Sequence, residues 1–281
     1  MAYTTVQLLE SIEKRAAIPI SQSTFTNPQI LGLASEAIET ELLPKIIKAK
    51  QDFYITYEDI SLSKGTGDNH SWIRIPFRAV GQSIVSISNP INDCEIDASS
   101  FWVEGSKIYF ENPSLSSYRI RYYLRPSKLV ETSSVGTITA IDTATGIVTV
   151  SSAPSDYTTS ITYDFVRANP GYDTLAINKT CSLVSSNNLT FTASDLPSEL
   201  AVGDYLCASD ESPVPQIPVE WFAFLAQLVA VEILTDLGDH GSADKAASRL
   251  KRMEDNVLSL ISPRIENKPK AIIRPFDYDR R

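Results

Sequence analysis

The chain has 281 residues, of which 43% are hydrophobic and 21% charged, and its formal net charge is −9 at pH 7. This length and composition suffice for one large domain or two, and they exclude a wholly disordered chain. The acidic balance argues against a protein that binds nucleic acid by neutralising phosphates. Three widely spaced cysteines with no CxxC pair indicate reduced thiols in a cytosolic environment.

Helical patterns occupy residues 1–50. A short helix is predicted over 4–15, with three apolar side chains on one face, Val6, Leu9 and Ile12. A second helix is predicted to begin near Thr26, because Gln29 stands three residues later as in a capping box. Pro44 falls inside the apolar spacing of this second helix, so we expect it to kink the helix or divide it in two.

From about Phe53 the hydrophobic period changes to two, which predicts a β-rich domain over 51–132. In the segment Tyr118–Leu124, every second residue is aromatic or aliphatic, and Arg119, Arg121 and Tyr123 stand between them, as in a strand with one buried face. The segment Gly65–Asp68 is predicted to be the turn of a hairpin that joins the strands Tyr54–Tyr57 and Trp72–Ile75.

A second β-rich segment is predicted over 133–214, where serine and threonine are frequent and a small barrel or sandwich is expected. Two short apolar runs in it are joined through Asp142–Gly146. These five residues lack the alternating ligands and terminal glutamate of a calcium loop, so they are predicted to be a hairpin turn.

Helical patterns return over 215–262. The first helix begins near Pro218 and ends before Gly238. It is apolar nearly all round, which indicates a central position in a bundle or burial by a neighbouring subunit. The candidate residues for this helical packing or subunit interface are Trp221, Phe222, Phe224, Leu225 and Leu228. A last helix is predicted over Ser242–Ile261.

The apolar faces at both ends of the chain need partners. We therefore predict an α+β fold in which 1–50 and 215–262 form one discontinuous helical bundle domain, interrupted by a barrel- or sandwich-like β-rich insertion. The uncharged run Trp221–Val231 is too short to span a bilayer, so no membrane partner is expected.

The final segment, 263–281, has no strong periodicity and holds six basic against three acidic side chains. It is too short to form a core, and its apolar residues predict an extended arm that docks on another surface. The alternative is an ordinary disordered chain end. The candidate docking residues are Ile272, Ile273, Arg274, Pro275, Phe276 and Tyr278.

The sequence marks no catalytic, cofactor or metal site. Its two histidines, His70 and His240, fall in predicted loops and are expected to be exposed to solvent. Nucleotide-binding, zinc-protease and serine-hydrolase motifs are absent from the sequence. The tyrosines and arginines of 118–123 resemble a surface on which the bases of single-stranded nucleic acid stack. The alternation of a β-strand with one buried face is the simpler explanation for them.

Several stretches resemble head-to-tail adaptor (connector) proteins of tailed bacteriophages. The more particular ones are Arg74–Gly81 (RIPFRAVG) and Tyr122–Pro126 (YYLRP). The resemblance implies a structural virion protein, assembled in the bacterial cytoplasm, that forms a ring of commonly twelve copies beneath the portal protein. It also implies that the C-terminal arm reaches the portal. The β-rich part would face the tail or a nozzle protein, and DNA would pass without sequence-specific binding.

Two other classes of function are alternatives to an adaptor. A carbohydrate- or surface-binding tail component on a helical stalk is suggested by the Ser/Thr-rich middle of the chain with Trp72 and Trp102. Glycan binding would separate this class from an adaptor. An enzyme is disfavoured, because the sequence marks no nucleophile, base or metal set.

Overall fold

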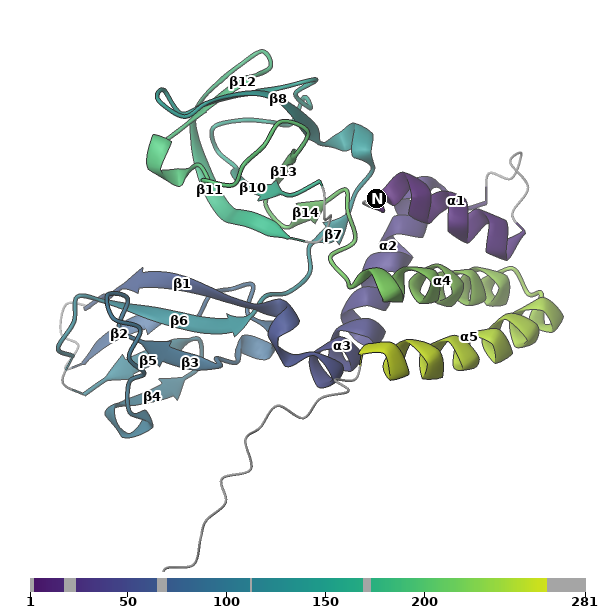
Figure 1. Ribbon diagram of the computed structural model, residues 1–281, viewed down its shortest axis with the longest axis horizontal. Helices are drawn as coiled ribbons and strands as arrows, with labels where there is room; N and C mark the ends of the chain where they lie inside the picture. The colour runs from purple at the N-terminus through teal and green to yellow at the C-terminus, as the bar shows by residue number, and fades with distance from the viewer. Residues whose placement is uncertain (1–2, 18–23, 65–69, 112, 169–172, 262–281) are drawn as a thin grey trace, which may run out of the picture.

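The computed structural model contains both helices and strands, so the predicted α+β class is confirmed. Helices gather in one region, and the strands form two β bodies beside it (Figure 1). The described residues are 3–17, 24–64, 70–111, 113–168 and 173–261. The predicted arm over 263–281, with all six of its candidate docking residues, lies outside them.

Helices from both ends of the chain share one hydrophobic core. The helix α4 lies at its centre and packs against α1, α2 and α5. Buried side chains come from every helix, among them Ile12, Ala34, Ile46, Leu225 and Val257. The helices are α1 (Thr5–Ala16), α2 (Asn27–Ala37), α3 (Leu43–Ala49), α4 (Phe222–Asp236) and α5 (His240–Ile261).

The apolar face predicted for the first helix is partly wrong. Val6 is exposed, and Leu8 is buried beside Leu9 and Ile12. The buried stripe instead consists of Thr5, Leu8, Leu9, Ile12 and Ala16, so Val6 lies on the outer face of the helix.

Local signals placed the second helix correctly. The capping box at its start is present, and the backbone N–H of Thr26 donates to Oε1 of Gln29 at 2.8 Å. The expected division at Pro44 is also present, as a π-helical turn over Ile38–Leu42. Since the proline ring collides with the carbonyl of the residue four before it, the helix widens ahead of Pro44 and restarts as α3 with Pro44 in its first turn.

The five residues proposed for helical packing lie at the start of α4 or just before it. Trp221, Phe222, Phe224 and Leu225 are buried, and Leu228 is half-buried against the same core. Their partners belong to the chain's own helices, so these side chains retain little surface for a neighbouring subunit. The end of α4 is marked by Gly238, whose φ of 77° suits glycine.

The first β body consists of two three-stranded sheets, ordered β1-β6-β3 and β2-β5-β4. They share a core that includes Ile73, Ile108 and Phe110. The alternation predicted in β6 is confirmed: Tyr118, Ile120 and Tyr122 are buried and the residues between them are half-buried. The strands are β1 (Ile55–Ser61), β2 (Ser71–Arg74), β3 (Ser86–Ser88), β4 (Phe101–Glu104), β5 (Lys107–Phe110) and β6 (Ser117–Tyr123).

The predicted pairing of Tyr54–Tyr57 with Trp72–Ile75 is wrong, and the predicted turn Gly65–Asp68 lies outside the described residues. β1 pairs along its length with β6, from Ile55 opposite Tyr123 to Ser61 opposite Ser117, and β2 pairs with β5. An isolated antiparallel bridge links Ser63, two residues after β1, to Trp72 on β2. Alternation indicates which face of a strand is buried but not which strand lies beside it. The two strands were therefore predicted to pair only because they are neighbours in the sequence.

The second β body is a closed antiparallel barrel, ordered β10-β11-β12-β9-β8-β13, as the barrel alternative predicted. Its interior is filled by apolar and aromatic side chains such as Val148, Tyr163, Phe165 and Phe191. The strands are β8 (Gly136–Asp142), β9 (Ile147–Val150), β10 (Thr162–Val166), β11 (Thr174–Ser185), β12 (Asn188–Phe191) and β13 (Tyr205–Ala208).

The predicted turn at Asp142–Gly146 is confirmed, since β8 pairs with β9 across it. The Asp142 carboxylate accepts from the backbone N–H groups of Ala144 and Thr145. Gly146 has a φ of 74°, and a Cβ at this position would overlap the carbonyl oxygen of Phe191. The turn therefore requires glycine and uses its aspartate as a cap.

The chain enters and leaves the barrel side by side. The strand β7 (Lys128–Leu129), just before the barrel, pairs in parallel with β14 (Glu211–Ser212), just after it. The backbone N–H of Leu129 also donates to the hydroxyl of Ser35 on α2 at 2.9 Å. These contacts tie the barrel to the helices at the point of insertion. Among the helices of the described segments, none has the length and hydropathy to cross a bilayer.

The three thiols should differ sharply in reactivity. Cys94 is exposed, whereas Cys181 and Cys207 are buried free thiols whose pKa is raised by burial. Since the thiolate is the reactive form, a colorimetric disulfide reagent at pH 8 should modify one thiol per native chain and three in denaturant. Cys94→Ser should abolish the native reaction. Rapid modification of all three in the native protein would contradict this burial.

Candidate functional site

A buried ion pair joins the two β bodies. Arg78, in the loop after β2, is 1% exposed, and Asp164 on β10 is 0% exposed. The Nη1 of Arg78 donates to Oδ2 of Asp164 at 2.5 Å, and its Nη2 donates to the hydroxyl of Ser127 at 2.6 Å. The guanidinium thus reaches from the first β body to the barrel and to the segment between them.

Asp164 is also bonded from the barrel side. Its carboxylate accepts from the backbone N–H groups of Asn178 at 2.9 Å and Asp210 at 3.1 Å. The side chain of Asp210 lies 3.5 Å from Nε of Arg78, and burial raises the pKa of that carboxyl while Arg78 lowers it. Each buried charge therefore has several partners, as burial of a charge requires.

Removal of one partner of this pair should be costly. Arg78→Met leaves the Asp164 carboxylate buried without its cation, so the free energy of unfolding should fall by about 3–5 kcal/mol. Urea unfolding measures this loss. The matched control is Arg74→Met, because Arg74 is exposed and forms no ion pair with described residues. Equal stability of the two variants would refute a structural role for the buried pair.

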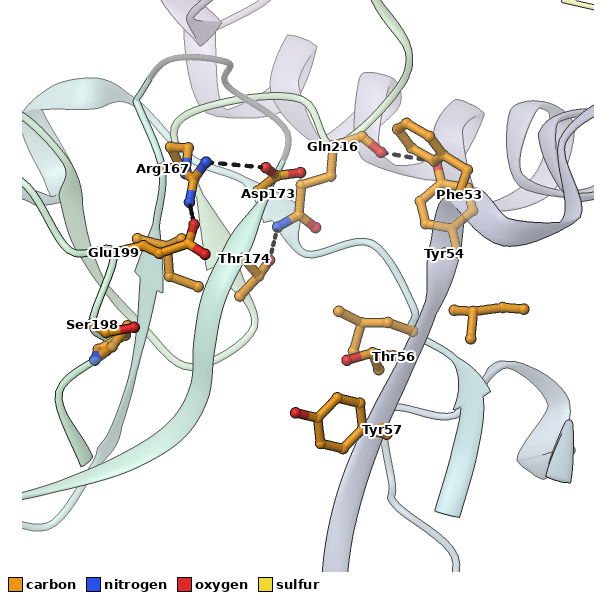
Figure 2. A pocket seen from close by; sticks show the side chains of 14 residues that line it. Phe53, Tyr54, Thr56, Tyr57, Arg167, Asp173, Thr174, Ser198, Glu199 and Gln216 are labelled. Atoms are coloured by element: carbon orange, nitrogen blue, oxygen red, sulfur yellow. Dashed lines mark hydrogen bonds and ion pairs between the residues drawn. The ribbon is translucent and has the colours of Figure 1, made fainter. Parts of the chain in front are cut away.

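Beside this junction, a groove of about 540 Å³ lies between β1 and the barrel strand β11 (Figure 2). Thr56 and Tyr57 lie on one wall, and Arg167, Asp173 and Glu199 lie on the other. Arg167 pairs with Glu199, and its Nη1 lies 3.7 Å from the Asp173 carboxylate. The cation of this wall is therefore already paired within the chain, and the two carboxylates leave the wall with a net negative charge.

Gln216 closes the inner end of the groove and contacts three parts of the chain. Its backbone carbonyl accepts from the Tyr54 hydroxyl at 2.8 Å, and its Nε2 donates to the Thr174 hydroxyl at 2.6 Å. Its Oε1 accepts from the backbone N–H of Ser127 at 2.8 Å. Gln216 is 4% exposed, so this groove is the outer edge of a buried polar joint.

An aromatic row crosses the outer face of the β2-β5-β4 sheet. Trp72 is paired with Tyr109, and Tyr109 is paired with Trp102, so the three rings share one face. The Trp102 and Tyr109 rings are stacked, with centroids 5.5 Å apart. Trp102 is 39% exposed, and the other two are half-buried. We call Trp72, Tyr109 and Trp102 the aromatic row.

Polar and charged groups border the aromatic row. Lys107 places its Nζ 3.9 Å from the centroid of the Trp72 ring, a cation–π contact. His70 packs edge-on against Trp102 at 4.9 Å. Such a surface can stack on flat or apolar groups while its rim forms hydrogen bonds.

The histidine predictions are half right. His240 is exposed at the start of α5, as expected. His70 is half-buried, because the Trp102 ring covers it. No group of three or more His, Cys, Asp or Glu side chains that could hold a metal ion occurs in the described part of the chain.

Sequence reasoning named Trp72 and Trp102 but missed Tyr109, Arg78 and Asp164. The last two carried a signal, since each is a single charge inside an apolar run, Ile75–Val80 for Arg78 and Tyr163–Val166 for Asp164. A charge within a run that is otherwise buried must find a partner. The sequence could not name that partner, because 86 residues separate the two.

Comparison of the chain with protein-family models, with curated proteins and with solved structures finds no match.

Proposed function

We propose that this chain is a structural virion protein, one subunit of an adaptor ring that joins the portal to the tail and forms part of the DNA channel. The observation that supports the proposal best is the buried joint of Arg78, Asp164 and Gln216. A spacer between two large assemblies must keep its parts in register. Arg78 comes from Arg74–Gly81, one of the segments on which the adaptor resemblance rests.

In this proposal the parts of the chain have separate roles. The segments 1–50 and 215–262 form a discontinuous helical bundle domain that packs laterally in a ring, commonly of twelve copies. The arm over 263–281 docks on the portal through its apolar residues. The two β bodies, 51–132 and 133–214, face the tail or a nozzle protein, where the aromatic row is a suitable contact. The acidic balance of the chain lets DNA pass without binding it.

The proposed arm can be tested by truncation. Deletion of 263–281 should abolish attachment to the portal protein encoded with this chain, because the arm supplies the apolar contacts. The circular dichroism spectrum and the unfolding midpoint of the truncated chain should stay near those of the full chain. Electron microscopy of portal mixed with each protein measures the fraction of portals that carry a closed ring.

Matched substitutions separate apolar docking from charge. The double variant Ile272→Ser/Phe276→Ser should lower the fraction of ring-bearing portals at least tenfold. The double variant Arg280→Ser/Arg281→Ser should change that fraction less than twofold. Normal attachment by the truncated chain would eliminate the arm as the docking element. A wild-type chain that never forms a ring on the portal would eliminate the adaptor function itself.

A second candidate function is a carbohydrate- or surface-binding tail component on a helical stalk. The aromatic row favours it, because partly exposed rings with a polar rim suit the flat apolar faces of sugar rings. The same row serves a nozzle contact in the adaptor proposal, so the two functions differ in ligand and not in surface.

Binding of the full chain to an array of bacterial surface glycans distinguishes these functions. If the second candidate holds, Trp102→Ala should weaken glycan binding about tenfold or more, since it removes the most exposed ring of the row. Phe77→Ala is the matched control, because Phe77 is 65% exposed and outside the row. Absence of glycan binding by the wild-type chain removes this candidate.

A further inference from the structure

A basic groove of about 770 Å³ lies between α1, α4 and α5. Four cationic side chains line it, Lys14, Arg15, Lys245 and Arg249. Among the residues that the structure describes, none of the four forms an ion pair with a carboxylate. In an acidic chain, four converging cations that form no ion pair are unusual, so this groove offers a site for anionic groups.

Arg15 is held in place within the basic groove. Its Nη1 donates to Oε1 of Gln227 at 2.8 Å, and Gln227 is 3% exposed. Burial, and then repulsion from Arg249, lower the pKa of Arg15. The carboxylate that also lines the groove, Asp239, accepts from the backbone N–H of Ser242 at 3.1 Å just before α5. Hydrogen bonds from Ser242, and then the charge of Lys245, lower the pKa of Asp239, so this one carboxylate faces four cations. The groove thus has a fixed cation whose charge is poorly compensated.

On α2 and α4, an acidic face carries an excess of negative charge, the opposite of the basic groove. It consists of Glu36 on α2 with Glu232 and Asp236 on α4, and none of the three forms an ion pair with a described residue. Burial raises the pKa of Glu232, and repulsion from Glu36, Asp236 and Glu41 raises it further. A cation placed against this face would relieve that repulsion.

The two charged surfaces lie on opposite sides of α4. Gln227 faces the basic groove, and Glu232 follows it by five residues, which is about 140° of rotation around the helix. Asp236 follows Gln227 by nine residues, about 180°. A contact between the groove of one molecule and the acidic face of another is therefore head-to-tail, and such a contact repeats into a ring where its rotation closes.

We propose that the basic groove receives the acidic face of a second copy of this chain, so that the two surfaces form the lateral contact of the ring. This inference rests on the proposed adaptor function, and it names the surfaces through which neighbouring subunits of the ring make contact. The arm over 263–281 is itself basic and does not suit the groove. A phosphate would suit the groove but would leave the acidic face without a partner.

Charge reversal with complementary mixing tests the proposal. The groove variant is Lys245→Glu/Arg249→Glu, and the face variant is Glu36→Lys/Asp236→Lys; all four residues are exposed. Each variant alone opposes like charges, so its self-association at low salt should weaken at least tenfold. An equimolar mixture should recover association, because an alternating ring pairs opposite charges at every contact. Mixing either variant with wild type should not restore closed rings.

Sedimentation velocity without portal and electron microscopy with portal give separate readouts. The control Lys251→Glu/Arg252→Glu, exposed on α5 and outside the groove, should behave as wild type. Wild-type rings on the portal, with variants that assemble equally well, would overturn this interface and leave the adaptor function standing. Rescue by mixing in sedimentation, with no ring on the portal, would support the interface and reject the adaptor function. Nucleic-acid binding that the groove variant loses, without any self-association, would overturn the proposal.

Discussion

The buried pair of Arg78 and Asp164 is the interaction on which the arrangement of the two β bodies depends. A charge buried this fully is stable only where its partners are fixed in position. Here those partners are the carboxylate of a barrel strand, the hydroxyl of Ser127 and the backbone N–H groups of Asn178 on β11 and Asp210 in the turn after β13. Any rotation of the barrel against the first β body would leave these groups without partners and out of contact with water.

The polar joint around Gln216 extends that constraint to the helices. One side chain and its carbonyl contact Tyr54, Ser127 and Thr174, which belong to the end of the helical segment, the inter-body segment and the barrel. The parallel pairing of β7 with β14 ties both crossings of the chain together. A body held at several points in this way transmits force between its ends, which is the property that an adaptor between portal and tail requires.

The surfaces proposed to contact partners lie on different parts of the molecule. The aromatic row lies on the first β body, and the basic groove and acidic face lie on the helical region. None of these surfaces uses the residues that hold the joint. Contacts with partners can therefore change without loss of the internal geometry, because the buried joint and the surface contacts draw on different side chains.

Local features could be predicted from the sequence alone. The capping box at Thr26, the alternation in β6 and the turn at Asp142–Gly146 each depend on residues a few positions apart. Only the tertiary structure decided that β1 pairs with β6 and that Asp164 is the partner of Arg78. It also decided that basic side chains gather on one side of α4 and acidic side chains on the other. The physical reason is range: hydrogen bonds and apolar spacing within a segment specify its own conformation. A buried charge or an exposed strand edge states only that a partner is needed, and the folded core selects which distant residue supplies it.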